Sequence, residues 1–130
     1  MLALDSNILI RYLVEDDPEQ TRVAAEFIET QLSASDPGFV SLVVLCEVAW
    51  TLRSGYGFER TQVQDTLSRL SKARQLSFEH AEIVDRALSG GGQDAADVIV
   101  HALGQLHGCS ATVTFDRRFA RLEGVHLLKS

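Results

Sequence analysis

The chain has 130 residues, 45% of them apolar and 23% charged, which is ordinary usage for one globular domain and argues against disorder or a fibrous repeat. Its formal net charge of −6 argues against a protein that holds nucleic acid through a broad basic surface. From the length and the composition we expect a single domain over residues 1–130.

The sequence also limits the location and the redox chemistry. No apolar run approaches the roughly 18 residues of a membrane span, and the short apolar start reaches Asp5 too soon for a signal peptide. We expect a cytoplasmic protein with no membrane contact. Cys46 and Cys109 lack the spacing of a zinc site or a disulfide framework, and we expect both to be small core residues.

In the first half of the chain, strands alternate with helices. Residues 2–4 predict a strand, and a helix follows the turn Asp5-Ser6-Asn7. The next helix starts at Asp17-Pro18 and extends to about residue 32. Residues 39–41 predict a second strand, after which Ser41 caps an apolar helix that ends near residue 55.

The second half repeats this alternation. Helices are expected around residues 63–70 and 83–88, with a strand at residues 75–78 between them. A loop at residues 90–92 precedes a helix over residues 95–106, and strands follow at residues 111–115 and 125–128. This order predicts the α/β class, as a three-layer α/β/α sandwich with a mostly parallel central sheet.

Two acids directly follow predicted strands, Asp5 after the first and Asp116 after the fourth. Ligands bind beyond the carboxyl ends of the strands in open parallel sheets, so residues distant in sequence meet there. Taken alone, each acid is better explained as an ordinary loop acid or a helix cap.

Glu47 interrupts an apolar helical run, Leu42 to Trp50, and a carboxylate buried there needs a partner. The alternative is that it lies on one exposed stripe of the helix. Asp97 is likewise an isolated acid in an apolar helix, whereas Asp94, at the start of that helix, is explained by capping or by an outer role.

We therefore expect Asp5, Glu47, Asp97 and Asp116 to converge in one divalent-metal pocket. Carboxylates gathered in one place repel one another, and a cation relieves that repulsion. All-oxygen ligation suits Mg²⁺, with Mn²⁺ as a substitute.

The chain resembles the PIN-domain nucleases in an ordered set of motifs: Asp5-Ser6-Asn7, Glu47, Asp94-Ala95-Ala96-Asp97 and Thr114-Phe115-Asp116. Within that family, a chain of this length is similar to a VapC-type toxin of a toxin–antitoxin pair. The resemblance implies a PIN-like fold, with the four acids as catalytic metal ligands. It also implies supporting roles for Asn7 and Thr114, Mg²⁺-dependent hydrolysis of RNA, a homodimer, and silencing by a cognate small antitoxin protein.

Several residues remain open at this point. His101 departs from the family pattern, and is either a structural histidine or a residue that touches metal or Asp97. For substrate phosphates we expect Arg117, Arg118 and Arg11, with Arg53 and Arg121 as further cations. The alternative for each arginine is a solvated charged face or an ion pair within the chain.

Other functions fit the sequence less well. A phosphoryl-accepting signalling domain would show an adjacent acid pair after the first strand, and a haloacid-dehalogenase-type phosphatase would show Asp-x-Asp in place of Asp5-Ser6-Asn7. An RNA-processing nuclease without an antitoxin, or a non-catalytic RNA- or protein-binding module, remains an alternative to a toxin.

Overall fold

The computed structural model describes residues 1–129. Its strands are β1 (Leu2–Ala3), β2 (Gly38–Val40), β3 (Leu76–Phe78), β4 (Thr112–Thr114) and β5 (Val125–Leu127). Its α-helices are α1 (Ser6–Leu13), α2 (Pro18–Glu26), α3 (Leu42–Ser54), α4 (Arg60–Ser71), α5 (Ala81–Ala87) and α6 (Ala95–Leu106). A π-helical turn η1 (Phe27–Gln31) extends α2, and a 3-10 turn η2 (Phe119–Arg121) precedes β5. The predicted order of elements is confirmed.

Side-chain caps fix where the helices begin. Asp17 accepts the N–H of Gln20 at 3.1 Å at the start of α2. Ser41 accepts the N–H of Val44 at 3.1 Å at the start of α3, as expected from the sequence. The Ser41 cap places the end of β2 close to the helix that follows it.

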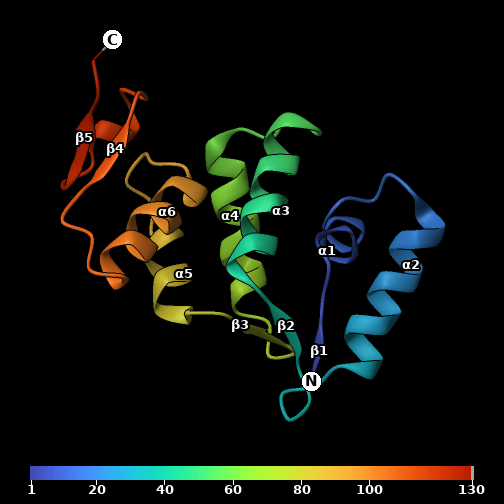
Figure 1. The fold of residues 1–130 in the computed structure, drawn as a ribbon. Helices are drawn as coiled ribbons and strands as arrows, with labels where there is room; N and C mark the ends of the chain where they lie inside the picture. The colour runs from blue at the N-terminus through green and yellow to red at the C-terminus, as the bar shows by residue number, and fades with distance from the viewer. Residues whose placement is uncertain (130) are drawn as a thin grey trace.

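All strand pairs are parallel, and the α/β class is confirmed. Within residues 1–129 the strands form two sheets, one of order β1-β2-β3 and one of β4-β5. In Figure 1 the β1-β2-β3 sheet lies at the bottom of the view and β4-β5 at the upper left, with α3, α4, α5 and α6 between them. The two acids that follow β1 and β4 are therefore carried by different sheets.

The core lies between the first sheet and the helices that pack on it. Gly38 allows this close packing, because a Cβ atom there would lie 2.8 Å from Leu4 Cδ1 and 2.9 Å from Leu32 Cδ1. The most deeply buried apolar side chains come from several helices: Leu9, Ile28, Leu45, Leu52, Leu67 and Ile99. No helix in the described part of the chain has the length and apolar character that crossing a membrane requires.

Candidate active site

Asp5 and Asp116 are both exposed and both held by backbone hydrogen bonds. Asp5 Oδ1 accepts the N–H of Ser6 at 2.8 Å and caps α1. Asp116 Oδ1 accepts the N–H groups of Arg118 at 2.8 Å and Phe119 at 3.1 Å. Each carboxylate therefore has a fixed orientation that leaves Oδ2 free of these bonds.

Thr114 is hydrogen-bonded to the backbone of Asp116. Its Oγ1 accepts the N–H of Asp116 at 3.0 Å, which shapes the turn at the end of β4. Asn7, in the first turn of α1, is exposed two residues after Asp5.

Asp97 is half-buried in the first turn of α6. Burial raises the pKa of its carboxyl, and the negative charges of Asp94 and Asp116 raise it further, while the positive charge of Arg60 lowers it. Three of the acids that the sequence singled out therefore share one negative region around the start of α6.

Asp94 occupies the N-cap position of α6, but its side chain makes no capping bond. It instead accepts a hydrogen bond of 2.7 Å from Arg60 Nε, and the two form an ion pair. Asp94 therefore pairs with Arg60 of α4 and does not cap α6 through its side chain.

Glu47 is exposed, so the expectation of a carboxylate buried inside an apolar helix is wrong. The physical reason is that α3 buries only one side, formed by Leu42, Leu45, Val48, Ala49 and Leu52. Val43 and Trp50, each 70% exposed, lie on the opposite side with Glu47 between them in sequence. The alternative that Glu47 lies on an exposed stripe is correct.

The exposed stripe of α3 nevertheless lies close to the acids of α6. Burial raises the pKa of the Cys46 thiol, and the charge of Asp97 raises it further. The two helices pack against each other. Trp50, on the same exposed stripe as Glu47, lines one pocket with Asp94 and Asp97.

The described chain does not bring all four acids together. Among residues 1–129, no group of three or more His, Cys, Asp or Glu side chains is arranged to hold one metal ion. The carboxylate oxygens are of the kind that Mg²⁺ binds, but their arrangement in one chain does not fit a complete metal site. The cause is the division into two sheets, since Asp5 follows β1 and Asp116 follows β4. The assignment of the four acids as ligands stays a prediction.

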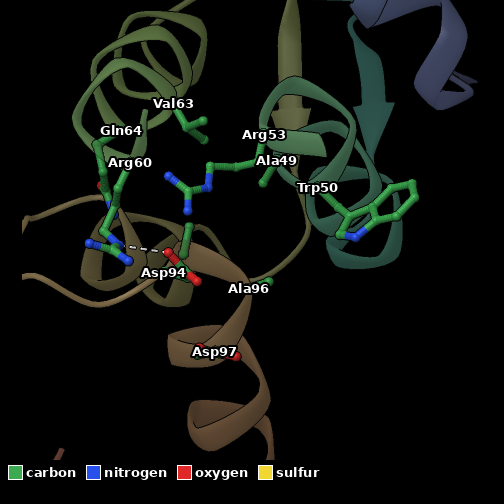
Figure 2. Close-up of a pocket in the computed structure, with 10 residues that line it drawn as sticks. Ala49, Trp50, Arg53, Arg60, Val63, Gln64, Asp94, Ala96 and Asp97 are labelled. Carbon is green, nitrogen blue, oxygen red and sulfur yellow. Dashed lines mark hydrogen bonds and ion pairs between the residues drawn. The ribbon is translucent and has the colours of Figure 1, made fainter. Parts of the chain in front are cut away.

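A pocket of about 220 Å³ adjoins the acids at the start of α6. Figure 2 shows Arg53 of α3 and Arg60 of α4 extending toward Asp94, with Trp50 at one side. Guanidinium groups bind phosphate oxygens, and an exposed indole ring can stack on a nucleobase. The pocket therefore combines two carboxylates with two guanidinium groups and an exposed indole ring.

A comparison with protein-family models matches the PIN domain over residues 2–125. The chain belongs to the PIN-domain family. Members of this family are generally nucleases, which hydrolyse phosphodiester bonds and typically depend on divalent metal ions. A comparison with curated proteins found no match.

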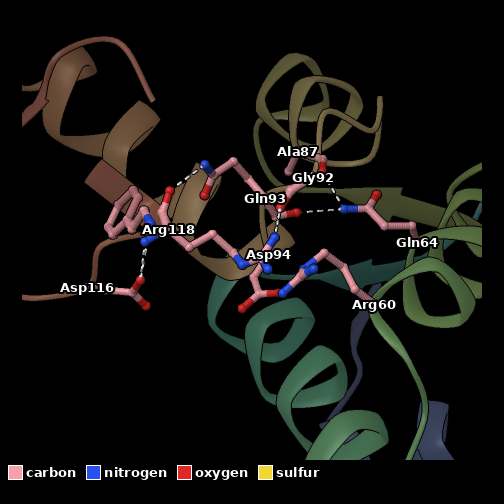
Figure 3. A network of polar contacts seen from close by, with 9 residues as sticks. Arg60, Gln64, Ala87, Gly92, Gln93, Asp94, Asp116 and Arg118 are labelled. Atoms are coloured by element: carbon pink, nitrogen blue, oxygen red, sulfur yellow. Dashed lines mark hydrogen bonds and ion pairs between the residues drawn. The ribbon is translucent and has the colours of Figure 1, made fainter. Parts of the chain in front are cut away.

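The arginines of this PIN domain are arranged only partly as the sequence suggests. Arg117 and Arg118 are exposed beside Asp116. Arg118 Nη1 donates to the carbonyl of Gly92 at 3.2 Å, and Gln93 Nε2 donates to the carbonyl of Arg118 at 2.8 Å (Figure 3). These bonds tie the loop after β4 to the loop before α6.

Arg11 is engaged elsewhere. Its Nη1 donates to Asp16 Oδ1 at 2.9 Å, and it lies 3.5 Å from the Tyr56 hydroxyl oxygen. The alternative of intramolecular pairing therefore describes Arg11.

His101 is structural in this PIN domain. It is 2% exposed, and its Nδ1 lies 2.7 Å from Thr112 Oγ1, so it joins α6 to β4. Its Nε2 has no hydrogen-bond partner among residues 1–129, and the ring packs against Gly124. The contact that the structure shows is therefore with β4 and not with Asp97.

Sequence reasoning missed some residues of the site and misplaced one cysteine. Trp50 stands in an apolar run and so predicts only core packing, although its spacing of three from Glu47 places both on one helical face. Nothing in the sequence distinguishes Arg60, the first residue of α4, from an ordinary surface charge. Cys109 is exposed, so the expectation of a core residue is wrong, whereas Cys46 is partly buried.

Proposed function

We propose that this PIN domain is a Mg²⁺-dependent endoribonuclease, with Mn²⁺ as a possible substitute, and that it is the toxin of a VapBC-type toxin–antitoxin pair. The observation that carries the proposal is the negative region shared by Asp94, Asp97 and Asp116, in which the pKa of Asp97 is raised, next to the arginine-lined pocket. Perturbed carboxylates gathered beside a pocket are typical of catalytic sites.

In this proposal Asp97 and Asp116 would hold the ion together with Asp5 and Glu47, although the described residues do not bring all four acids to one place. Asn7, Asp94 and Thr114 would support them. The distinct task of Thr114 is to fix the turn that orients Asp116. Arg60 partly offsets the negative charge by pairing with Asp94, so that Asp97 stays ionised more readily. We expect Arg53 and Arg60 to bind RNA phosphates and Trp50 to stack on a base.

Arg117 and Arg118, which directly follow Asp116 and are exposed, would add to this substrate contact. Because the net charge is −6, we expect the protein to bind RNA through these local clusters of arginines and not through a broad basic surface. We further propose that the protein is cytoplasmic, that it forms a homodimer, that residues 1–130 are one domain, and that a small antitoxin protein covers the acidic region.

The test is cleavage of a panel of structured RNAs with Mg²⁺, with Mn²⁺, or with a chelator, by the wild type and by Asp5→Asn and Asp97→Asn. Asparagine at position 5 keeps an oxygen that can cap α1 while it removes the charge. We expect each variant to lose about 100-fold or more in kcat, as for removal of one stabilising group in an active site. Asp65→Asn, an exposed acid on α4, is the matched control and should retain activity.

Equal cleavage by the wild type and Asp97→Asn, or cleavage that survives chelation, would overturn the mechanism. The toxin assignment is tested separately by inducing the wild type and Asp97→Asn in cells. A toxin arrests growth only as the wild type, and co-expression of the cognate neighbouring gene product restores growth. Cleavage without growth arrest would favour an RNA-processing nuclease, and absence of cleavage by the folded wild type would favour a binding module.

A further inference from the structure

The pocket between α3, α4 and α6 brings together groups of opposite charge. Arg53 and Arg60 line it with Asp94 and Asp97, and Trp50 lies at one side (Figure 2). Arg60 Nε donates to Asp94 Oδ1 at 2.7 Å, so the charges of these two side chains are already matched. A phosphate placed against Arg60 would also face the Asp94 carboxylate, and the two negative charges would repel each other. The pair therefore favours a neutral ligand that offers both donors and acceptors over a phosphate group.

Much of the remaining lining of the pocket is apolar. Ala49, Val63 and Ala95 are all buried and all contribute to it. A phosphate has oxygens on every side and needs polar contacts all round, whereas a nucleobase has apolar faces and carries its polar atoms on its edge. The volume of about 220 Å³ is below the roughly 300–1,000 Å³ of a pocket that encloses a whole drug-sized ligand. The pocket therefore matches part of a nucleotide, and a flat base fits its apolar lining better than a phosphate does.

Trp50 supplies a stacking surface beside the paired arginine and aspartate. It is 70% exposed, although an indole ring gains much from burial. Exposed aromatic rings stack on the bases of single-stranded nucleic acids, because every base has a π-face. Stacking alone does not distinguish one base from another. The choice of base therefore depends on the side chains that face its edge.

The Arg60–Asp94 pair keeps hydrogen-bonding capacity after its own contact is made. Among residues 1–129 the guanidinium of Arg60 makes this one hydrogen bond, from Nε, so both Nη groups remain free. A carboxylate has about four acceptor sites, and Asp94 makes no capping bond to α6. The pair therefore presents a fork of donors beside an open acceptor.

We propose that this pair recognises a guanine base that is unpaired in single-stranded RNA and stacked on Trp50. Guanine carries two acceptors, O6 and N7, which match the bidentate fork of an arginine. Its N1–H and N2 amine are donors, which match a carboxylate. Adenine and cytosine carry an amino donor where guanine has O6, and uracil lacks both N7 and the N2 amine. Guanine is therefore the base whose edges Arg60 and Asp94 match most fully.

The position of the base in the RNA follows from the spacing of the acids, and this part of the inference rests on the proposed nuclease function. Asp97 lies three residues after Asp94, and residues three apart are neighbours on a helix surface. A guanine held by Asp94 therefore brings its own phosphodiester next to Asp97. Arg53, which is exposed, keeps the phosphate contact of the proposed function, while Arg60 contacts the base. The bond that is hydrolysed then adjoins a guanosine.

Trp50 is the one tryptophan of the chain, so its fluorescence measures binding at the pocket without any measurement of cleavage. The wild type is titrated, with a chelator present, with the 5′-monophosphates of guanosine (GMP), adenosine, cytidine and uridine. All four carry the same phosphate, so differences between them report the base. We expect GMP to quench the fluorescence with an affinity about tenfold or more above that of the others, as a bidentate base contact discriminates. Equal affinities, or no quenching by GMP, overturn the proposal.

Two analogues test the individual contacts with the base. Inosine 5′-monophosphate lacks the N2 amine, and 7-deazaguanosine 5′-monophosphate has carbon in place of N7. We expect each analogue to bind about fivefold or more weakly than GMP, because each leaves one side of the pair without its partner. An analogue that binds as tightly as GMP overturns the contact that it lacks.

Asp94→Asn and Arg60→Met remove the two sides of the pair. Asparagine is as good an N-cap residue as aspartate, so α6 should keep its start, and circular dichroism checks that both variants are folded. We expect both to bind all four nucleotides weakly through Trp50, with affinities within about twofold of one another. The matched control is Arg69→Met, an exposed arginine of α4 outside the lining of the pocket, and it should keep the preference for GMP. A preference that survives in folded Asp94→Asn overturns the proposal.

Sequencing the ends of RNA fragments tests where the guanine lies. We expect the wild type to produce ends at or next to guanosine, and Asp94→Asn to lose this bias in whatever cleavage it retains. Selective binding of GMP without a guanosine bias at the ends overturns the position of the base beside Asp97. A wild type that cleaves no RNA overturns the nuclease function, while the selective binding of GMP still stands.

Discussion

Replacing Thr112 by valine tests whether the contact between α6 and β4 stabilises the fold. Valine has nearly the shape of threonine but lacks the hydroxyl, so packing is preserved and one hydrogen bond is lost. That hydroxyl lies 2.7 Å from Nδ1 of His101, which is 2% exposed. Because Nε2 already has no partner among residues 1–129, the variant leaves both ring nitrogens unpaired.

An unsatisfied buried polar atom costs about 1–3 kcal/mol, and we expect a loss near the middle of this range, about 2 kcal/mol. With a urea dependence of about 2 kcal/mol per M, the unfolding midpoint falls by about 1 M. Circular dichroism is the suitable probe, because Trp50 is 70% exposed and its fluorescence will report unfolding poorly.

Thr112→Ser is the matched control, since it keeps the hydroxyl and loses only a methyl group. We expect serine to be destabilised less than valine. A midpoint for Thr112→Val within about 0.2 M of the wild type, or equal losses for the two variants, would refute the reasoning that the hydrogen bond with His101 stabilises the fold.

Three further changes are informative. Tyr56→Phe removes the hydrogen bond that contributes most to lowering the pKa of Asp16 below its ordinary value of 3.8, so that pKa should rise; an unchanged NMR titration would contradict this. A lowered carboxyl pKa stabilises the fold above pH 3.8, and this contribution is lost as the pH falls through the folded-state pKa. The variant should therefore be less stable than the wild type near neutral pH and equally stable in strong acid. Arg60→Met removes the positive charge that lowers the pKa of Asp97, so NMR should show this pKa rising, more at low salt than at high salt; a fall would be incompatible with the ion-pair geometry. Gly124→Ala forces a side chain at φ 84° and places Cβ 3.1 Å from the buried histidine ring, so thermal unfolding should show a loss of about 1–2 kcal/mol or more, and wild-type stability would show that the loop relaxes freely.

The sequence predicted the order of the elements because local signals define them. Asp17 with Pro18 marks the start of α2, and Ser41 marks the start of α3. Alternating strands and helices then indicate parallel pairing, which the structure confirms. Such signals act within a few residues and do not depend on which parts of the chain meet later.

The site was less predictable because it depends on how elements pack. An apolar helix such as α3 does not reveal which side is covered, and α1, α4 and α6 together leave Val43, Glu47 and Trp50 exposed. Similarly, the position of Asp116 after a strand does not indicate which strand lies beside it. The sequence pattern gives no direct signal for the division into two sheets.

The π-helical turn at the end of α2 helps to shape a groove of about 1010 Å³ that lies beside β1. Such a turn holds one residue more than the α-helical turn it replaces, and one residue corresponds to a rotation of about 100° along an α-helix. Phe27 and Gln31, the first and last residues of η1, both line the groove beside β1. Loss of a single residue from η1 would therefore rotate the groove wall relative to the buried Leu32 while every acid kept its place in its own element. The length of this turn, and not only its side chains, therefore determines the shape of the groove beside β1.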